Sequence, residues 1–232
     1  MNPQNNPHSP ISRQPDAVII PETNYQAFLK VLLQGDRSSC HTQVESMLRQ
    51  DTPIRAIYVE LFQRALYEVG ALWEANRISV AVEHLATAIV ESLLGTIYPR
   101  LFAAERTGRK AVISCVAGEY HQIGGRMVAD TFEMCGWDGY FLGANTPMEE
   151  LCHILLEKKP NMLALSLSVF FNLHHLHTAI ARIRTDMPEI PIIVGGQAFR
   201  WGGRDIGSTY SGVRYIPTLQ HLERVLHQEY AP

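Results

Sequence analysis

The segment AVISCVAGEYHQIGG, residues 111–125, decides the fold class of this chain. A short apolar run, residues 111–116, is followed by a glycine-containing loop and then by a helical pattern that begins near Gly124. Strand, loop and helix in this order are the first part of a βαβ unit. The loop is neither a dinucleotide-binding G-x-G-x-x-G nor a phosphate-binding loop with its Gly-Lys-Ser/Thr, so nucleotide binding loses its main support.

The same rhythm continues downstream, where apolar runs alternate with helical stretches. The further runs are residues 139–142, 162–168, 190–194 and 213–216, and helices are predicted near residues 124–135, 147–158, 173–185 and 219–227, with a short one near Trp201. The pattern predicts a five-stranded, parallel, flavodoxin-like sheet with helices on both faces over residues 110–232. Ligands of such sheets bind at the carboxyl ends of the strands, where the strand order reverses.

Residues 21–104 have a helical periodicity instead. After Pro53, apolar residues recur at the i, i+3, i+4, i+7 spacing from Ile54 to Val69, and Ser79 supplies the N-cap oxygen of the next helix. Four helices with short loops predict an antiparallel four-helix bundle. Residues 1–20 carry four prolines among Asn, Gln and Ser and are expected to form a flexible tail.

Composition narrows the class of protein. With 46% hydrophobic and 19% charged residues and a net charge of -3, the chain is globular and has no general attraction for nucleic acid. Its four cysteines form no C-x-x-C pair, so neither a zinc site nor a disulfide framework is indicated. No export signal or membrane anchor is recognisable, and a cytoplasmic location is expected.

The loop after the first predicted strand places Glu119 two residues before His121. A carboxylate at this spacing can orient an imidazole for metal binding. One histidine cannot hold a bare ion, but it can ligate a metal whose other positions are filled by a macrocycle, and Gly124 and Gly125 would let such a ring approach the backbone. A corrin and a haem both fit. The alternative is that His121 only caps the following helix.

Two other strand ends carry matching features. The third run ends in Ser166-Leu-Ser168 and the fourth in Gly195-Gly196. The order E-x-H-x-x-G, 41 residues, S-x-S, 26 residues and G-G resembles the cobalamin-binding domain family, whose pattern is D-x-H-x-x-G, S-x-L and G-G at these separations. The resemblance spans about half of the chain.

The resemblance implies a set of roles. In that family the benzimidazole of the cofactor leaves cobalt and the loop histidine replaces it, so His121 would be the lower axial ligand with Glu119 as its hydrogen-bond partner. The motif residue Gly124, Ser166 and Ser168 would then contact the cofactor, with Ser166 lining the slot for the nucleotide tail, for which Gly195 and Gly196 would leave room. Glu119 replaces the commoner Asp, Ser168 replaces Leu, and Asn172 stands near the relay serine of methyl-transferring relatives. These departures weaken a methyltransferase role more than cobalamin binding.

The helical half carries W-x9-E-H at Trp73, Glu83 and His84. This motif resembles the CarH-type light-sensing cobalamin regulators, in which a helical bundle covers the upper corrin face. By that resemblance Trp73 stacks on the upper side and Glu83 and His84 contact the upper axial group. Glu74 stands where those sensors have a histidine, so a second imidazole would come from His84, His41 or His8. The alternative is that Trp73 is bundle core and that Glu83 and His84 form a solvated first helical turn.

The expected function follows from this domain content. The roughly 20 residues before the bundle are too few for a helix-turn-helix DNA-binding domain. The chain therefore resembles the AerR/PpaA group of cobalamin-dependent antirepressors, which act on a transcriptional repressor in response to light. We expect a non-enzymatic regulator with a repressor as partner, no direct contact with nucleic acid or membrane, and a homo-oligomeric state left open. The alternatives are a corrinoid carrier of a methyltransferase system and a haem-binding sensor.

Overall fold

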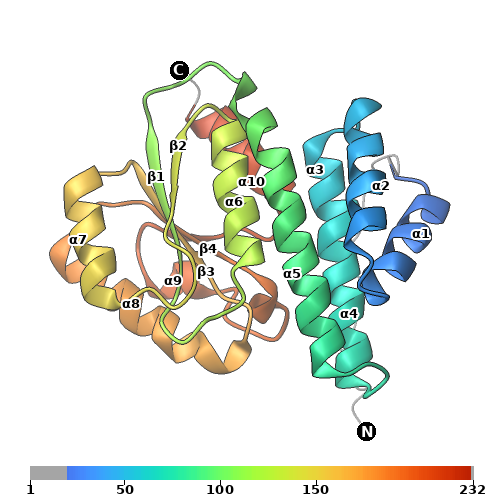
Figure 1. Cartoon of the computed structure of the whole chain (residues 1–232). Helices are drawn as coiled ribbons and strands as arrows, with labels where there is room; N and C mark the ends of the chain where they lie inside the picture. The colour runs from blue at the N-terminus through green and yellow to red at the C-terminus, as the bar shows by residue number, and fades with distance from the viewer. Residues whose placement is uncertain (1–19, 231–232) are drawn as a thin grey trace, which may run out of the picture. The chain divides into compact units, whose positions relative to one another are not determined.

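The computed structural model describes residues 20–230, with helices before residue 104 and a parallel sheet after residue 109 (Figure 1). The tail predicted for residues 1–20 lies, except for Ile20, outside the described residues. The chain divides into two compact units between Glu83 and His84. The predicted succession of a helical region and a five-stranded parallel sheet is confirmed.

The first unit is helical because its apolar residues recur at helical spacing. Its elements are α1 (Glu22–Leu33), α2 (Arg37–Arg49), α3 (Ile54–Ala56), the π-helical turn η1 (Ile57–Gln63) and α4 (Arg64–Glu74). Tyr25 and Phe28 from α1 are buried with Tyr58 and Phe62 from η1, and the Phe28 and Phe62 ring centroids lie 5.9 Å apart. The long helix predicted after Pro53 is therefore present, with a π-helical segment in its middle.

Helix α5 (Val80–Ile97) and the 3-10 helix η2 (Tyr98–Ala103) lead into the second unit. The predicted cap is confirmed, since the Ser79 hydroxyl accepts the backbone N–H of Val82 at 3.3 Å. Among the described residues, one helical stretch, Val80–Ala103, is long and apolar enough by length and composition to cross a membrane. The core helix of a soluble protein passes the same test, and six side chains of α5 are buried in the protein.

The compact unit that starts at His84 begins earlier than the linker predicted between residues 104 and 110. The reason lies in contacts between α5–η2 and α6 (Ile123–Met134). Gln122 Nε2 donates to Glu91 Oε1, and the Arg126 guanidinium lies 5.6 Å from the centroid of the Tyr98 ring. These contacts join most of α5 to the α/β unit, so it is not a helix of the first unit alone.

The sheet has the strand order β2-β1-β3-β4-β5, and every pairing is parallel. Its strands are β1 (Lys110–Cys115), β2 (Asp138–Phe141), β3 (Met162–Ser166), β4 (Ile192–Gly195) and β5 (Val213–Tyr215). The remaining helices are α7 (Met148–Lys158), η3 (Phe170–Asn172), α8 (Leu173–Asp186), η4 (Gln197–Arg200), α9 (Ile206–Thr209) and α10 (Leu219–Glu229). The predicted flavodoxin-like order is confirmed, and its direction reverses between β1 and β3.

Both faces of the sheet are covered, which explains why its strands are continuous apolar runs. Helices α6 and α10 pack on one face, where Phe132 and Trp137 are buried. Helices α7 and α8 pack on the other face, around residues such as Leu165 and Ile180. Figure 1 shows the two helix layers on opposite sides of the strands. The polar loops after β1 and β3 then meet at the carboxyl edge, beside the reversal point.

Candidate functional site

The loop between β1 and α6 is built around the side chain of Glu119, which is 0% exposed. Its Oε1 accepts the backbone N–H of His121 at 3.0 Å and lies 2.6 Å from Nδ1 of the same residue. Its Oε2 accepts the backbone N–H groups of Ser168 and Val169 at 2.8 and 2.9 Å. One buried carboxylate therefore joins the loop after β1 to the loop after β3, at the point where the strand order reverses.

This environment keeps Glu119 ionised. Burial by itself would raise the pKa of the carboxyl group, but the hydrogen bonds from His121, Val169 and Ser168 outweigh it and lower the pKa to about 2. An anionic acceptor beside Nδ1 selects the imidazole tautomer that carries its proton there. The lone pair then belongs to Nε2, on a side chain that is 60% exposed. An imidazole that a carboxylate orients through Nδ1 is suited to bind a metal through Nε2.

The donor set around His121 fits a metal that brings most of its own ligands. Over residues 20–230, no group of three or more His, Cys, Asp or Glu side chains is arranged to hold a metal ion. A bare ion would need several protein donors, whereas a metal in a macrocycle needs one axial imidazole. The alternative, in which His121 caps α6, concerns the start of a helix whose N-cap residue is Gln122 and whose N-cap side chain makes no hydrogen bond.

Two asparagines brace the same loop. Asn145 Oδ1 accepts the backbone N–H of Gly118 at 2.8 Å, and the backbone N–H of Asn145 donates to the Glu119 carbonyl at 2.9 Å. Asn172 Nδ2 donates to the Gly118 carbonyl at 3.1 Å. From the sequence, Asn172 is recognisable only as a departure from a family pattern, and Asn145 was not predicted. The available signal was an Asn two residues after Gly143. Asn is a residue type that tolerates a positive φ, which is 49° at Asn145.

The predicted serines and glycines gather at this edge of the sheet. Ser166 ends β3 and pairs with Cys115 of β1 and with Gly195 of β4. A Cβ on Gly124 would meet no atom closer than the Ser166 hydroxyl at 4.0 Å, so there is open space at this position. Ser168 lies beyond the end of β3, which is shorter than the predicted run, because its backbone N–H bonds to Glu119 instead of continuing the strand.

Gly195 and Gly196 also have a structural reason to be glycine. Gly196 has a φ of 121°, and a Cβ there would come within 2.1 Å of the Leu167 carbonyl oxygen. A Cβ on Gly195 would lie 2.9 Å from the carbonyl oxygen of Ile216. Close approach of backbone to backbone requires the pair, in addition to any space that it leaves for a ligand.

His84 lies on the part of α5 that extends past the sheet. Helices α5 and α6 run in the same direction, with Glu91 beside Gln122 and Tyr98 beside Arg126. Within the unit that starts at His84, the residues of α5 before Glu91 therefore extend beyond the first residue of α6, which marks the carboxyl edge of the sheet (Figure 1). Because His84 precedes Glu91 by seven residues, both lie on one helix face, about 10 Å apart along the axis.

The other two residues of the W-x9-E-H motif belong to the first unit. Trp73 lies in the last turn of α4 and is 47% exposed. The alternative that Trp73 is a core side chain of the helical unit is therefore wrong. Glu83 lies in the first turn of α5, where a carboxylate is favoured by the helix dipole.

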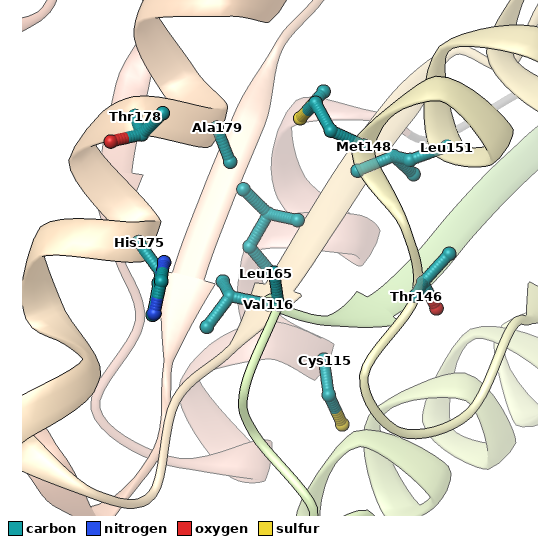
Figure 2. A pocket seen from close by; sticks show the side chains of 10 residues that line it. Cys115, Val116, Thr146, Met148, Leu151, Leu165, His175, Thr178 and Ala179 are labelled. Atoms are coloured by element: carbon teal, nitrogen blue, oxygen red, sulfur yellow. The ribbon is translucent and has the colours of Figure 1, made fainter.

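A small cavity of about 60 Å³ lies behind the β1–α6 loop, between α7 and α8 (Figure 2). Met148 and Leu151 of α7, Leu165 of β3 and His175 of α8 are among the side chains that line it. Its volume is that of about two water molecules, so it does not admit a macrocycle. None of the predicted site residues lines this cavity.

Comparison with known proteins connects the two halves of the chain. Residues 109–216 match the model of a B12 binding domain, and residues 25–98 match a second model that is also described as a B12 binding domain. A monomethylamine corrinoid protein from Methanosarcina barkeri has a similar solved structure, with a TM-score of 0.77, 13% identity, and coverage of 88% of this chain and 97% of that chain. At this identity, that likeness shows the fold alone.

Two curated relatives from Myxococcus xanthus are transcriptional regulators. The HTH-type transcriptional repressor CarH is 26% identical over 77% of this chain, and the HTH-type transcriptional repressor CarA is 27% identical over 66%. The chain matches 59% and 52% of the lengths of these two proteins. Neither relative is named as an enzyme. Between the two macrocycles that a single axial imidazole allows, the matched domains decide for the corrin. One region in each half of the chain, residues 25–98 and residues 109–216, matches a B12 binding domain, and the cofactor of the chain is cobalamin.

Proposed function

We propose that this chain is a light-responsive cobalamin sensor that regulates transcription through a partner repressor, with His121 as the lower axial ligand of cobalt. The observation that carries the proposal is the pair of Glu119 and His121, in which a buried carboxylate lies 2.6 Å from Nδ1 and orients the imidazole so that Nε2 would be its metal-binding atom. The two relatives named as transcriptional repressors support the regulatory role.

The residues around His121 are arranged to hold the ring still before the cofactor arrives. Glu119 makes four contacts with the loops after β1 and β3. Gly118 is fixed by Asn145, from the loop after β2, and by Asn172, from the segment between β3 and α8. A ligand fixed in this way loses little conformational freedom on binding metal. Open space at Gly124, next to Ser166, gives a bulky ligand access to the carboxyl edge.

Light would act on the opposite side of the corrin. Bound cobalamin would supply a cobalt centre whose upper ligand is exchanged on illumination. His84 lies on the part of α5 that precedes Glu91 and extends past the first residue of α6. Together with Trp73 and Glu83 it forms the W-x9-E-H motif, which resembles the motif of the light-sensing regulators. A change in what these side chains contact would alter the position of α5. Such coupling needs only about 1–3 kcal/mol of differential interaction between the two ligand states.

The output is proposed to go to a protein. A net charge of -3 gives the chain no general attraction for phosphate, so the acceptor of the signal is more readily a repressor than DNA. The carrier alternative is weakened by Asn172, which stands near the relay serine of methyl-transferring relatives and donates to the Gly118 carbonyl.

The test compares His121→Ala with His174→Ala, which removes an exposed imidazole from α8. Each variant is loaded with cobalamin in the dark, and visible spectra and the electron paramagnetic resonance of the Co(II) state are recorded before and after illumination. We expect nitrogen coupling from histidine in the wild type and in His174→Ala, and its loss in His121→Ala. Wild-type ligation in His121→Ala would contradict the axial assignment. Spectra that do not respond to light, together with methyl transfer from the loaded protein to a thiol, would favour a carrier.

A further inference from the structure

Gln122 connects the ligand loop to α5. It follows His121 directly and is the N-cap residue of α6, where its carbonyl accepts the backbone N–H of Arg126 at 2.9 Å. Its side chain makes no cap hydrogen bond, and Nε2 donates to Glu91 Oε1 at 2.5 Å. A movement of the loop that displaces His121 therefore displaces the partner of Glu91 as well.

A second contact fixes the direction of α5. One turn further along α6, the Arg126 guanidinium lies 5.6 Å from the centroid of the Tyr98 ring. Two contacts along neighbouring helices determine both their separation and their relative slide. Of these two, the pair of Glu91 and Gln122 is nearer to the carboxyl edge of the sheet, since Gln122 immediately precedes α6.

The same helix face carries His84. Residues seven apart are two turns apart and share a face, so a slide of α5 at Glu91 moves His84 by the same amount. The path from His84 through α5 to Glu91, and across the hydrogen bond to Gln122, ends one peptide bond from His121. Each step is a rigid helix, a hydrogen bond or a covalent bond.

We propose that Glu91 and Gln122 are positioning residues that set the place of α5, and of His84 on it, relative to His121. This inference rests on the proposed function, in which His121 binds cobalt from below and His84 lies toward the upper side. The hydrogen bond between Glu91 and Gln122 thereby couples the position of His121, below the corrin, to the position of α5, which carries His84 toward the upper side.

Glu91 is exposed and Gln122 half-buried, so a substitution at either position leaves the core intact. A hydrogen bond of this kind changes an equilibrium constant by about twofold to tenfold. We expect Glu91→Ala and Gln122→Glu to raise the dissociation rate of cobalamin by that factor and to shift the imidazole 15N resonances of His121 in the cofactor-free protein. Gln122→Glu places two carboxylates together, so its effect is the larger.

The exchange of partners provides the decisive control. Glu91→Gln retains an acceptor oxygen for Gln122, and the double variant Glu91→Gln with Gln122→Glu restores the bond with donor and acceptor reversed. Both are expected to remain close to the wild type, as is Ser92→Ala, which alters an exposed neighbour on α5. Thermal unfolding of every variant separates local coupling from a general loss of stability.

The outcomes distinguish this inference from the proposed function. If the double variant is no better than Gln122→Glu, or if Glu91→Ala behaves as Ser92→Ala does, the positioning role is wrong. That result leaves the axial role of His121 in place as long as His121→Ala still loses the histidine signal. If His121→Ala keeps that signal, the proposed function fails first, and the inference fails with it.

Discussion

Replacement of Glu119 by Gln tests the centre of the site with a change of one atom. The carboxylate accepts three backbone N–H groups, at 3.0, 2.8 and 2.9 Å, and lies 2.6 Å from the imidazole Nδ1. An amide has one acceptor oxygen and one NH2 group. Whichever way it is turned, the NH2 group faces either the donors of the β3 loop or those of His121, so about half of the contacts are lost.

The cost of this change can be worked out from the contacts. A hydrogen bond to a charged group contributes about 1.5–3 kcal/mol, and a buried donor left without an acceptor costs about 1–3 kcal/mol. Since Glu119 is fully buried, water does not replace the lost acceptor. We expect Glu119→Gln to lower the free energy of unfolding by about 2–4 kcal/mol. Loss of the partner that orients His121 should also weaken cobalamin binding about 10- to 100-fold.

The assay uses urea unfolding of the cofactor-free protein and titration of each variant with cobalamin. Glu119→Asp is the matched control, because it keeps the charge and has the residue that is commoner in the resembling family. His121→Ala separates the two effects, since it removes the ligand but leaves the carboxylate with the N–H groups of the β3 loop. If Glu119→Gln unfolds within about 0.5 kcal/mol of the wild type and binds cobalamin within about twofold of it, Glu119 does not have the role described above.

Three further predictions concern two glycines at the sheet edge and two buried thiols, Cys115 of β1 and Cys40 of α2. Gly196→Ala should lower the free energy of unfolding by about 3 kcal/mol or more, or prevent folding, because Gly196 has a φ of 121° and a Cβ there would lie 2.1 Å from the Leu167 carbonyl oxygen. Gly124→Ala should unfold in urea almost as the wild type does, because the nearest atom to a Cβ there is 4.0 Å away. Equal stability of the two variants would show that the backbone crowding is not real. Burial raises the pKa of Cys115 to about 12 and that of Cys40 to about 11, so both thiols should react with a disulfide reagent at pH 8 far more slowly than in urea. Since these thiols ionise first in the unfolded state, stability should fall as pH rises above about 9, which urea midpoints measured from pH 8 to pH 10.5 would reveal.

Local patterns predicted the elements of the second unit closely. The strand predicted at residues 111–116 is β1 (Lys110–Cys115), and the helix predicted near residues 124–135 is α6 (Ile123–Met134). The spacing of apolar residues is a local property of the chain, and it indicates which side chains will be buried. The parallel direction of the strands follows from the same pattern, because a helical crossover joins each strand to the next.

The division of the chain was harder to predict. Periodicity placed α5 with the other helices, whereas the compact unit begins at His84. The contacts of Glu91 with Gln122 and of Tyr98 with Arg126 join segments about 30 residues apart, and no local pattern announces them. The same is true of Ser168, which contacts Glu119 through its backbone and not through its side chain.

The sequence alone determined the fold class, the edge of the sheet that carries the site, and the residue types gathered there, since spacing along parallel strands specifies which loops share an edge. The contacts that these residues make are visible only in the tertiary structure. The buried carboxylate of Glu119 joins the loop after β1 to the loop after β3. Asn145 also holds the loop after β1, and close backbone contacts require glycine at position 196. These features depend on distances between segments that are remote in the chain, and such distances exist only after the sheet has formed.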